Sequence, residues 1–142
     1  MYADDGQSQA QISRELGLQV ATAWTGQSAG PAEFQGTRTE VDQWTLGGPP
    51  RALWPLLKYS WPNGEEVYVS TVSGEVVQYT TRGSRIAAYF GAIPHWLYFT
   101  PLRKNGVLWR KTVIWASGIG MLISLLGLVI GIWVYSDRKS VV

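Results

Sequence analysis

The chain has 142 residues, with 12 Lys or Arg, 10 Asp or Glu and a formal net charge of +2. It contains no cysteine, which excludes disulfides, zinc–thiolate sites and cysteine nucleophiles. Its length suits one small domain, and its charge is divided, because nine of the ten acidic residues precede residue 76 while residues 76–136 carry only bases.

The first part of the chain predicts a turn, a helix and a strand. An Asp-Gly turn is expected at residues 4–6, followed by a helix over about residues 8–24 that Ser8 would cap. Gly17 weakens this helix in its middle. The apolar residues that recur at roughly helical spacing are Ile12, Leu16, Val20, Ala23 and Trp24. A strand is expected near residues 40–45.

The most regular pattern is an antiparallel meander over about residues 56–79. Apolar and polar residues alternate in three short runs, which are residues 57–61, 66–70 and 75–79. Turn residues separate the runs at 62–64 and 72–74. Val67 and Val69 should share one face of the sheet, as should Val77 and Tyr79. One helix beside such a meander predicts an α+β domain at residues 1–81.

Residues 82–112 are interpreted as a connector between this domain and the membrane. A short helical or interfacial segment is predicted at residues 84–90, and the aromatic run at 92–99 is expected at the membrane surface. Basic residues beside an apolar span favour contact with lipid phosphates over nucleic acid. The residues expected at the membrane interface are Trp96, Arg103, Lys104, Trp109, Arg110, Lys111, Trp133 and Tyr135.

A single transmembrane helix is predicted at residues 113–136. Residues 113–135 contain no Asp, Glu, Lys, Arg or His. As a helix they would be about 34 Å long, enough to cross a hydrocarbon core of about 30 Å. The alternative is a buried helix of a soluble protein, but so short a chain could hardly cover an apolar helix on all sides.

Small residues form a stripe along the predicted span, at spacings that place them on one helix face. They are Ser117, Gly120, Ser124, Gly127 and Gly131. Such a stripe lets a second helix approach closely in lipid, although Gly is also simply frequent in membrane helices. The expected partners are the lipid bilayer together with other helices of a longer parent chain, or a second copy of this one.

The last six residues, 137–142, read DRKSVV. They match the translation of a common sequencing-adapter sequence, so we expect that they do not belong to the natural protein. We therefore leave them out of the fold prediction and expect that removing them leaves the folded domain unchanged.

The run YVSTVSGEVVQYTTRGSRIAAYFGAIPHWLYFTPLR, followed by LWRKTVIWASGIG, resembles PepSY-domain membrane proteins with their associated transmembrane helices. The resemblance covers residues 42–136. It implies a bacterial inner-membrane protein with several spans and an extracytoplasmic domain that has a helix followed by strands. Some members are haem-containing reductases of ferric siderophores, which would link this chain to iron uptake. In them a His ahead of the span is a haem axial ligand, a role that maps onto His95.

Two functions stay open on the sequence alone. The first is part of a transmembrane electron-transfer protein in which His95 binds haem b, and the second is a non-catalytic extracytoplasmic binding or regulatory module. His95 is the only histidine, and haem held by two imidazoles needs another. The alternative is that His95 binds no cofactor and lies at the membrane interface among aromatic neighbours. Whether the protein is an enzyme stays open.

The side of the membrane on which the domain lies is also open to two arguments. The bases at 103–111 precede the span, and the positive-inside rule would place them and the domain in the cytoplasm. The resemblance implies the opposite side. We expect the extracytoplasmic side, because the residues after the span match adapter sequence and cannot be weighed by the rule.

Overall fold

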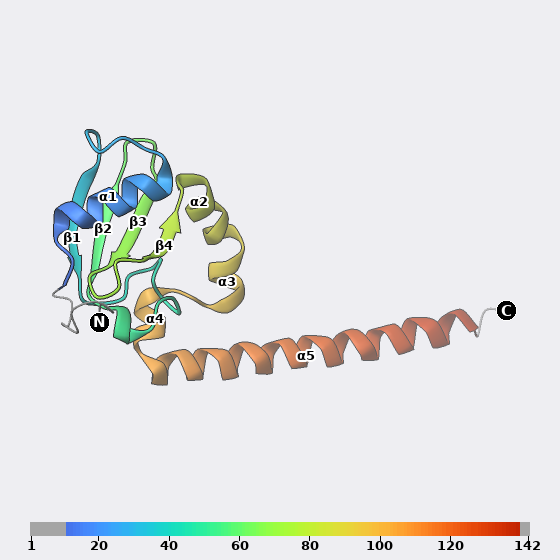
Figure 1. Ribbon diagram of the computed structural model, residues 1–142. Coiled ribbons are helices and arrows are strands. Elements are labelled where there is room, and N and C mark those ends of the chain that lie inside the picture. The colour runs from blue at the N-terminus through green and yellow to red at the C-terminus, as the bar shows by residue number, and fades with distance from the viewer. Residues whose placement is uncertain (1–10, 140–142) are drawn as a thin grey trace. The chain divides into compact units, whose positions relative to one another are not determined.

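The computed structural model describes residues 11–139 (Figure 1). Its contacts divide the chain into two compact units on either side of the Thr100–Pro101 bond. The first unit is an α+β domain with a four-stranded antiparallel sheet, and the second is dominated by a long apolar helix. The predicted fold class is confirmed at this level, whereas the likeness to PepSY domains stays a prediction.

Helix α1 (Arg14–Thr25) begins later than its apolar spacing suggested. Its cap is Ser13, whose Oγ accepts a hydrogen bond from the Leu16 amide at 3.2 Å. The residue before the cap does not belong to the helix, because the Ile12 amide donates a hydrogen bond to the Thr71 carbonyl at 2.8 Å. The prediction of a start near Ser8 was therefore wrong. Ser8 itself and the expected turn at residues 4–6 lie outside the described residues.

Four antiparallel strands follow in the spatial order β1-β2-β3-β4. They are β1 (Glu33–Arg38), β2 (Leu56–Ser60), β3 (Glu66–Ser70) and β4 (Val76–Thr80). The predicted meander is confirmed, including both turns. The Gly64 amide donates to the Trp61 carbonyl at 2.9 Å, and the Gly74 amide donates to the Ser70 carbonyl at 3.0 Å. Both glycines have positive φ angles, 84° and 74°, which other residues rarely adopt.

The strand expected near residues 40–45 is wrong, because this segment forms turns. The Asp42 carboxylate accepts hydrogen bonds from the backbone amides of Trp44 and Thr45, both at 3.0 Å, and so offers the backbone an alternative to a sheet ladder. The first strand is instead β1. Its burial alternates along the strand, but the partly buried positions are Phe34, Gly36 and Arg38, so only one large apolar residue marks the alternation in the sequence.

The core lies between α1 and one face of the sheet. Its buried members are Ile12, Ala21, Leu57, Tyr59, Trp61, Val67 and Val69. Val67 and Val69 share this face, as predicted. In β4 the residue that packs against the core is Val76 rather than Val77, since a register shift beside Val69 changes the alternation. Tyr79 pairs with Val67.

Gly17 has a packing role that its low helix propensity conceals. A Cβ added at this position would lie 2.6 Å from Leu57 Cδ1 and 2.7 Å from the Tyr59 hydroxyl. The same hydroxyl donates to the Arg14 carbonyl at 2.6 Å. Glycine therefore lets α1 approach β2 closely enough for this hydrogen bond.

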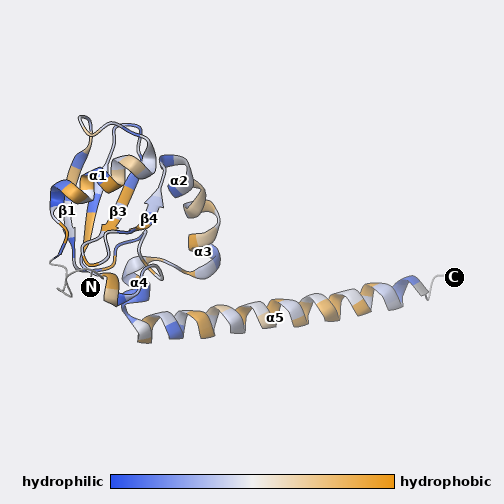
Figure 2. Cartoon of the chain, viewed as in Figure 1, coloured by the Kyte–Doolittle hydropathy of each residue, from blue (hydrophilic) through white to orange (hydrophobic). Residues whose placement is uncertain are grey.

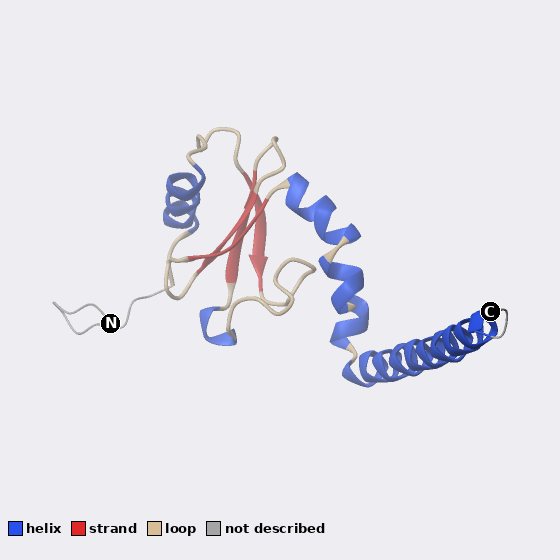
Figure 3. Cartoon of the chain, turned by 90° about the vertical axis from the view of Figure 1, so that its right-hand side faces the viewer, coloured by secondary structure: helices blue, strands red, loops and turns tan. Residues whose placement is uncertain are grey.

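Two further helices, α2 (Arg82–Phe90) and α3 (Ala92–Trp96), complete the domain, and the segment at residues 84–90, expected to be helical or interfacial, is helical. Helix α2 begins with a reciprocal capping box between Thr81 and Ser84. Figure 3 shows α1 on one side of the sheet and the two later helices on the other. A short 3-10 helix, η1 (Arg51–Leu53), lies in the connection between β1 and β2.

The second unit contains the end of α4 (Thr100–Lys104) and the long helix α5 (Gly106–Lys139). Asn105 lies between them and caps α5, because its side-chain oxygen accepts a hydrogen bond from the Leu108 amide at 3.0 Å. Figure 2 shows that apolar residues run along the length of α5, with hydrophilic colour near its two ends.

Candidate functional site

The strongest functional feature of the chain is the apolar helix α5. Residues Gly106–Arg138 are long and apolar enough to cross a membrane, and none of the most apolar stretch is buried against other described residues. Two hydroxyl groups on the helix bond back to its own carbonyls, Thr112 Oγ1 to Leu108 at 3.0 Å and Ser124 Oγ to Gly120 at 2.9 Å. This arrangement is the one that a lipid environment requires of polar groups.

The residues predicted at the membrane interface lie near the two ends of the apolar stretch or in the segment before it. Arg103 places its guanidinium 4.3 Å from the centre of the Trp109 ring. This cation–π pair joins a cationic group to an amphipathic aromatic one, the two residue types found at membrane surfaces. Exposed side chains at the two ends and in α3 are Trp96, Lys104, Arg110, Lys111, Trp133 and Tyr135.

The small-residue stripe lies within one continuous helix, as predicted. A Cβ added at Gly120, Gly127 or Gly131 would meet no atom within 4 Å. No part of the described chain therefore packs against these three glycines. Helix pairing along the stripe stays a prediction about another chain or another copy.

His95 lies on α3, where its side chain is exposed. Its ring meets the Trp96 ring edge-on, with 5.3 Å between the ring centres. Haem needs an apolar pocket for its macrocycle and, in the bis-histidine form, a second imidazole. His95 is the only histidine of the chain and its side chain is exposed, so residues 11–139 supply one of the two imidazoles that bis-histidine haem needs and do not complete a haem site by themselves. Its role as a ligand in a larger assembly stays a prediction.

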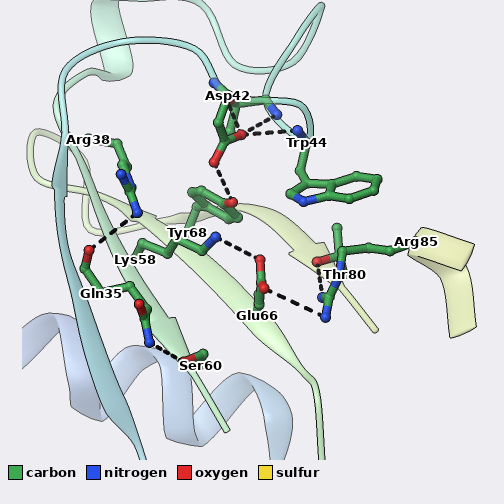
Figure 4. A network of polar contacts seen from close by, with 11 residues as sticks. Gln35, Arg38, Asp42, Trp44, Lys58, Ser60, Glu66, Tyr68, Thr80 and Arg85 are labelled. Carbon is green, nitrogen blue, oxygen red and sulfur yellow. Dashed lines mark hydrogen bonds and ion pairs between the residues drawn. The ribbon is translucent and has the colours of Figure 1, made fainter. Parts of the chain in front are cut away.

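A polar cluster on the sheet face opposite α1 did not emerge from the sequence (Figure 4). Glu66 on β3 is its centre. The Lys58 ammonium lies 2.8 Å from one Glu66 oxygen, and Arg85 of α2 lies 3.6 Å from the other. Arg85 also donates to Thr80 Oγ1 at 3.0 Å. Each of the three charged side chains is less than a fifth exposed, so these ion pairs are better shielded from solvent than ordinary surface pairs.

Asp42 and Tyr68 form the other half of this cluster. The buried Tyr68 hydroxyl donates to Asp42 Oδ2 at 2.6 Å, while Oδ1 accepts from Thr45 Oγ1 at 2.9 Å. Burial alone would raise the pKa of Asp42, but hydrogen bonds from Tyr68, Thr45 and two backbone amides outweigh it and hold the pKa below its ordinary value. Burial, followed by the bond to Asp42, raises the pKa of Tyr68.

The cluster attaches the β1–β2 connection and α2 to the sheet. Trp44 of the connection lies against Arg85, at 5.9 Å from the guanidinium carbon, and against Tyr89, at 5.7 Å between ring centres. The side chain of Gln43 donates a hydrogen bond to the Tyr98 carbonyl and accepts one from the Thr100 amide. Because its carboxylates are bonded within the cluster, we interpret it as structural.

Part of this cluster carried a sequence signal. Lys58 and Glu66 alternate with core residues on neighbouring strands, and the register places them diagonally, since Lys58 pairs with Tyr68 and Ser60 pairs with Glu66. Arg85 and Asp42 come from segments whose positions depend on tertiary folding. No group of three or more His, Cys, Asp or Glu residues that could hold a metal ion occurs in the described part of the chain.

The functional features of this chain are therefore an apolar helix with aromatic and basic flanks, and a domain in which a polar cluster holds the carboxylates of Glu66 and Asp42. Comparisons with models of protein families, with characterised proteins and with solved structures found no match.

Proposed function

We propose that this chain is a membrane-anchored α+β module, in which α5 spans a lipid bilayer and the folded domain is held at one membrane surface. The observation that carries the proposal is the exposure of apolar side chains around α5, with none of its most apolar stretch buried. Such a surface is unfavourable in water and favourable in hydrocarbon.

Several independent features of α5 support a transmembrane position over a merely adsorbed one. The helix is apolar all round, whereas an adsorbed helix has a strongly polar face. The hydroxyl groups of Thr112 and Ser124 are satisfied by carbonyls of the same helix. Aromatic side chains lie near each end of the apolar stretch, at about the separation of the two head-group regions.

Insertion can be tested with the double substitution Leu122→Arg and Leu126→Arg, which places two charges near the middle of α5. Each arginine costs about 3 kcal/mol at the centre of a membrane helix, so we expect most of the protein to lose alkali-resistant attachment to vesicles. The matched control is the pair Leu122→Ala and Leu126→Ala, which keeps the helix apolar. Equal attachment of the two double variants would contradict the proposal.

The domain is assigned to the extracytoplasmic side of a bacterial inner membrane and to binding or regulation rather than catalysis. This finer assignment is supported by the PepSY resemblance and by the plan of one helix followed by an antiparallel meander. The bases before α5 favour the opposite orientation. A cysteine at Ser73, in the β3–β4 turn of this cysteine-free chain, distinguishes the two. It should react with a membrane-impermeant thiol reagent on intact spheroplasts, and labelling only after lysis would reverse the assignment.

Electron transfer through haem is the second candidate. It is supported by the position of the one histidine, which lies exposed on α3 and about ten residues before the start of α5. The test is the Soret absorbance of the protein purified from membranes, with His95→Ala as the variant. A Soret band that disappears in the variant would favour this candidate over the module, and a band that is absent or unaltered would count against His95 as a ligand.

A further inference from the structure

Helix α2 carries an exposed stripe of large side chains, of which one, Tyr89, also meets the Trp44 ring of the β1–β2 connection edge-on. Arg82, Ile86, Tyr89 and Phe90 are spaced i, i+4, i+7 and i+8, which places them on one helix face. Ile86 is 52% exposed, Tyr89 54% and Phe90 87%. The apolar stripe of an amphipathic helix normally faces the core, whereas this one faces outwards.

The inward side of the same helix is the polar one. Arg85 points towards the sheet, where it reaches Glu66 and Thr80, and Ala88 is partly buried beside it. Helix α3 is fixed in turn by Ile93, which is buried, while Trp96 at its end is 62% exposed. The domain thus holds α2 through Arg85 and through the edge of Tyr89, and it leaves Ile86 and Phe90 largely exposed.

We propose that Ile86, Tyr89, Phe90 and Trp96 form a lipid-docking surface, which lies in the head-group region of the bilayer that α5 enters. This inference rests on the proposed function, because it assumes that α5 is inserted. It adds a second membrane contact, made by the folded domain itself, so that the domain has a fixed face towards the lipid.

The covalent chain keeps this surface near the bilayer. Nine residues lie between the last residue of α3 and the first of α5. Even fully extended they allow Trp96 to lie at most about 36 Å from Gly106, and the helical turns of α4 shorten that reach. The connection therefore limits how far the surface can lie from the start of α5, and it leaves enough reach for the surface to meet the lipid that α5 would enter.

The charge around the surface selects lipid over a second copy of the chain. Helices α2 and α3, which carry the surface, contain no Asp or Glu, and exposed Arg82 lies in the stripe itself. Anionic head groups attract such a surface, and aromatic side chains are favoured at this depth. Two copies meeting through the stripe would instead offer Arg82 no acidic partner from α2 or α3.

The test is the depth of a fluorescent probe on the full chain, reconstituted into vesicles that contain phosphatidylglycerol. Because the chain has no cysteine, Ala87→Cys carries the dye at an exposed position beside the stripe and leaves all four docking residues in place. The expected result is a blue-shifted emission that spin-labelled lipids quench at shallow depth. Gln19→Cys, exposed on α1 across the sheet, is the matched control and should report water.

A second pair of variants attributes any quenching to the stripe. Ile86→Ser with Phe90→Ser in the Ala87→Cys background changes only exposed side chains, so the domain should stay folded while lipid quenching is largely lost. Inserted protein whose probe at position 87 behaves like the one at position 19 would overturn the docking surface and leave the anchor intact. Protein that fails to float with vesicles would overturn the anchor and the docking surface together.

Discussion

The two units of this chain treat the same side chain in opposite ways. Leu57 in the domain is 5% exposed and packs beneath α1, whereas Leu126 in α5 is 54% exposed. The domain satisfies its backbone between strands and buries large apolar side chains against the sheet, while α5 satisfies its backbone internally and buries nothing in its apolar stretch. One part of the sequence thus buries apolar surface within its own fold, and the other leaves it exposed, as a hydrocarbon environment would allow.

The sharpest way to break this comparison is to make one substitution in both units. Leu57→Ala should lower the free energy of unfolding of the domain by about 2–5 kcal/mol, because it leaves a cavity in the core. Leu126→Ala should leave that free energy unchanged, since its side chain packs against nothing in the domain. Chemical denaturation in detergent micelles, followed by near-ultraviolet circular dichroism, measures both. Equal losses would show that α5 contributes to the domain core.

The next largest effect should come from Gly17→Ala. Alanine favours a helix by about 1 kcal/mol over glycine, yet its methyl group would overlap Leu57 and the Tyr59 hydroxyl. We expect a net destabilisation of about 1–3 kcal/mol, because overpacking outweighs propensity. Gly30→Ala is the control, since a Cβ there meets no atom within 4 Å. A more stable Gly17→Ala variant would mean that α1 can move away from β2 at little cost.

The smallest effect concerns Asp42. The pKa of its carboxyl group is lowered in the folded state, so its charge stabilises the fold at neutral pH. This stabilisation is lost as the pH falls below the pKa of the unfolded chain, about 3.9, and then through the lower pKa of the folded state. Asp42→Asn should remove about 1 kcal/mol at neutral pH, with the modest size reflecting partial exposure. The difference between wild type and variant should shrink in acid. A difference that is independent of pH would show that the charge contributes nothing.

Local patterns were sufficient for the elements that depend on neighbours in sequence. The alternation of apolar residues in β2 and β3, with turn residues between them, predicted the meander and its core face. The unbroken apolar run likewise predicted α5. These features need no information about the rest of the fold.

Long-range contacts decided what the sequence could not show. The amide of Ile12 bonds to Thr71, so α1 begins at a later serine than the first available one. The Asp42 side chain accepts hydrogen bonds from the backbone and so makes residues 40–45 a turn, although their composition is also compatible with a strand. The same reasoning applies to the polar cluster, where Arg85 reaches Glu66 only after α2 folds back over the sheet. The outward stripe of α2 became visible only when the partner of Arg85 was known.

Asn105 gives the second unit a mechanical property. It is the one residue between α4 and α5, and it caps a helix about 50 Å long, whereas the apolar residues 113–135 need only about 34 Å. If α5 spans a bilayer as proposed, about two helical turns, at residues 106–112, would extend past the hydrocarbon as a stiff lever. A piston movement or a tilt of the span would be transmitted to Asn105 without being absorbed by slack chain, so displacement within the bilayer becomes displacement at its surface.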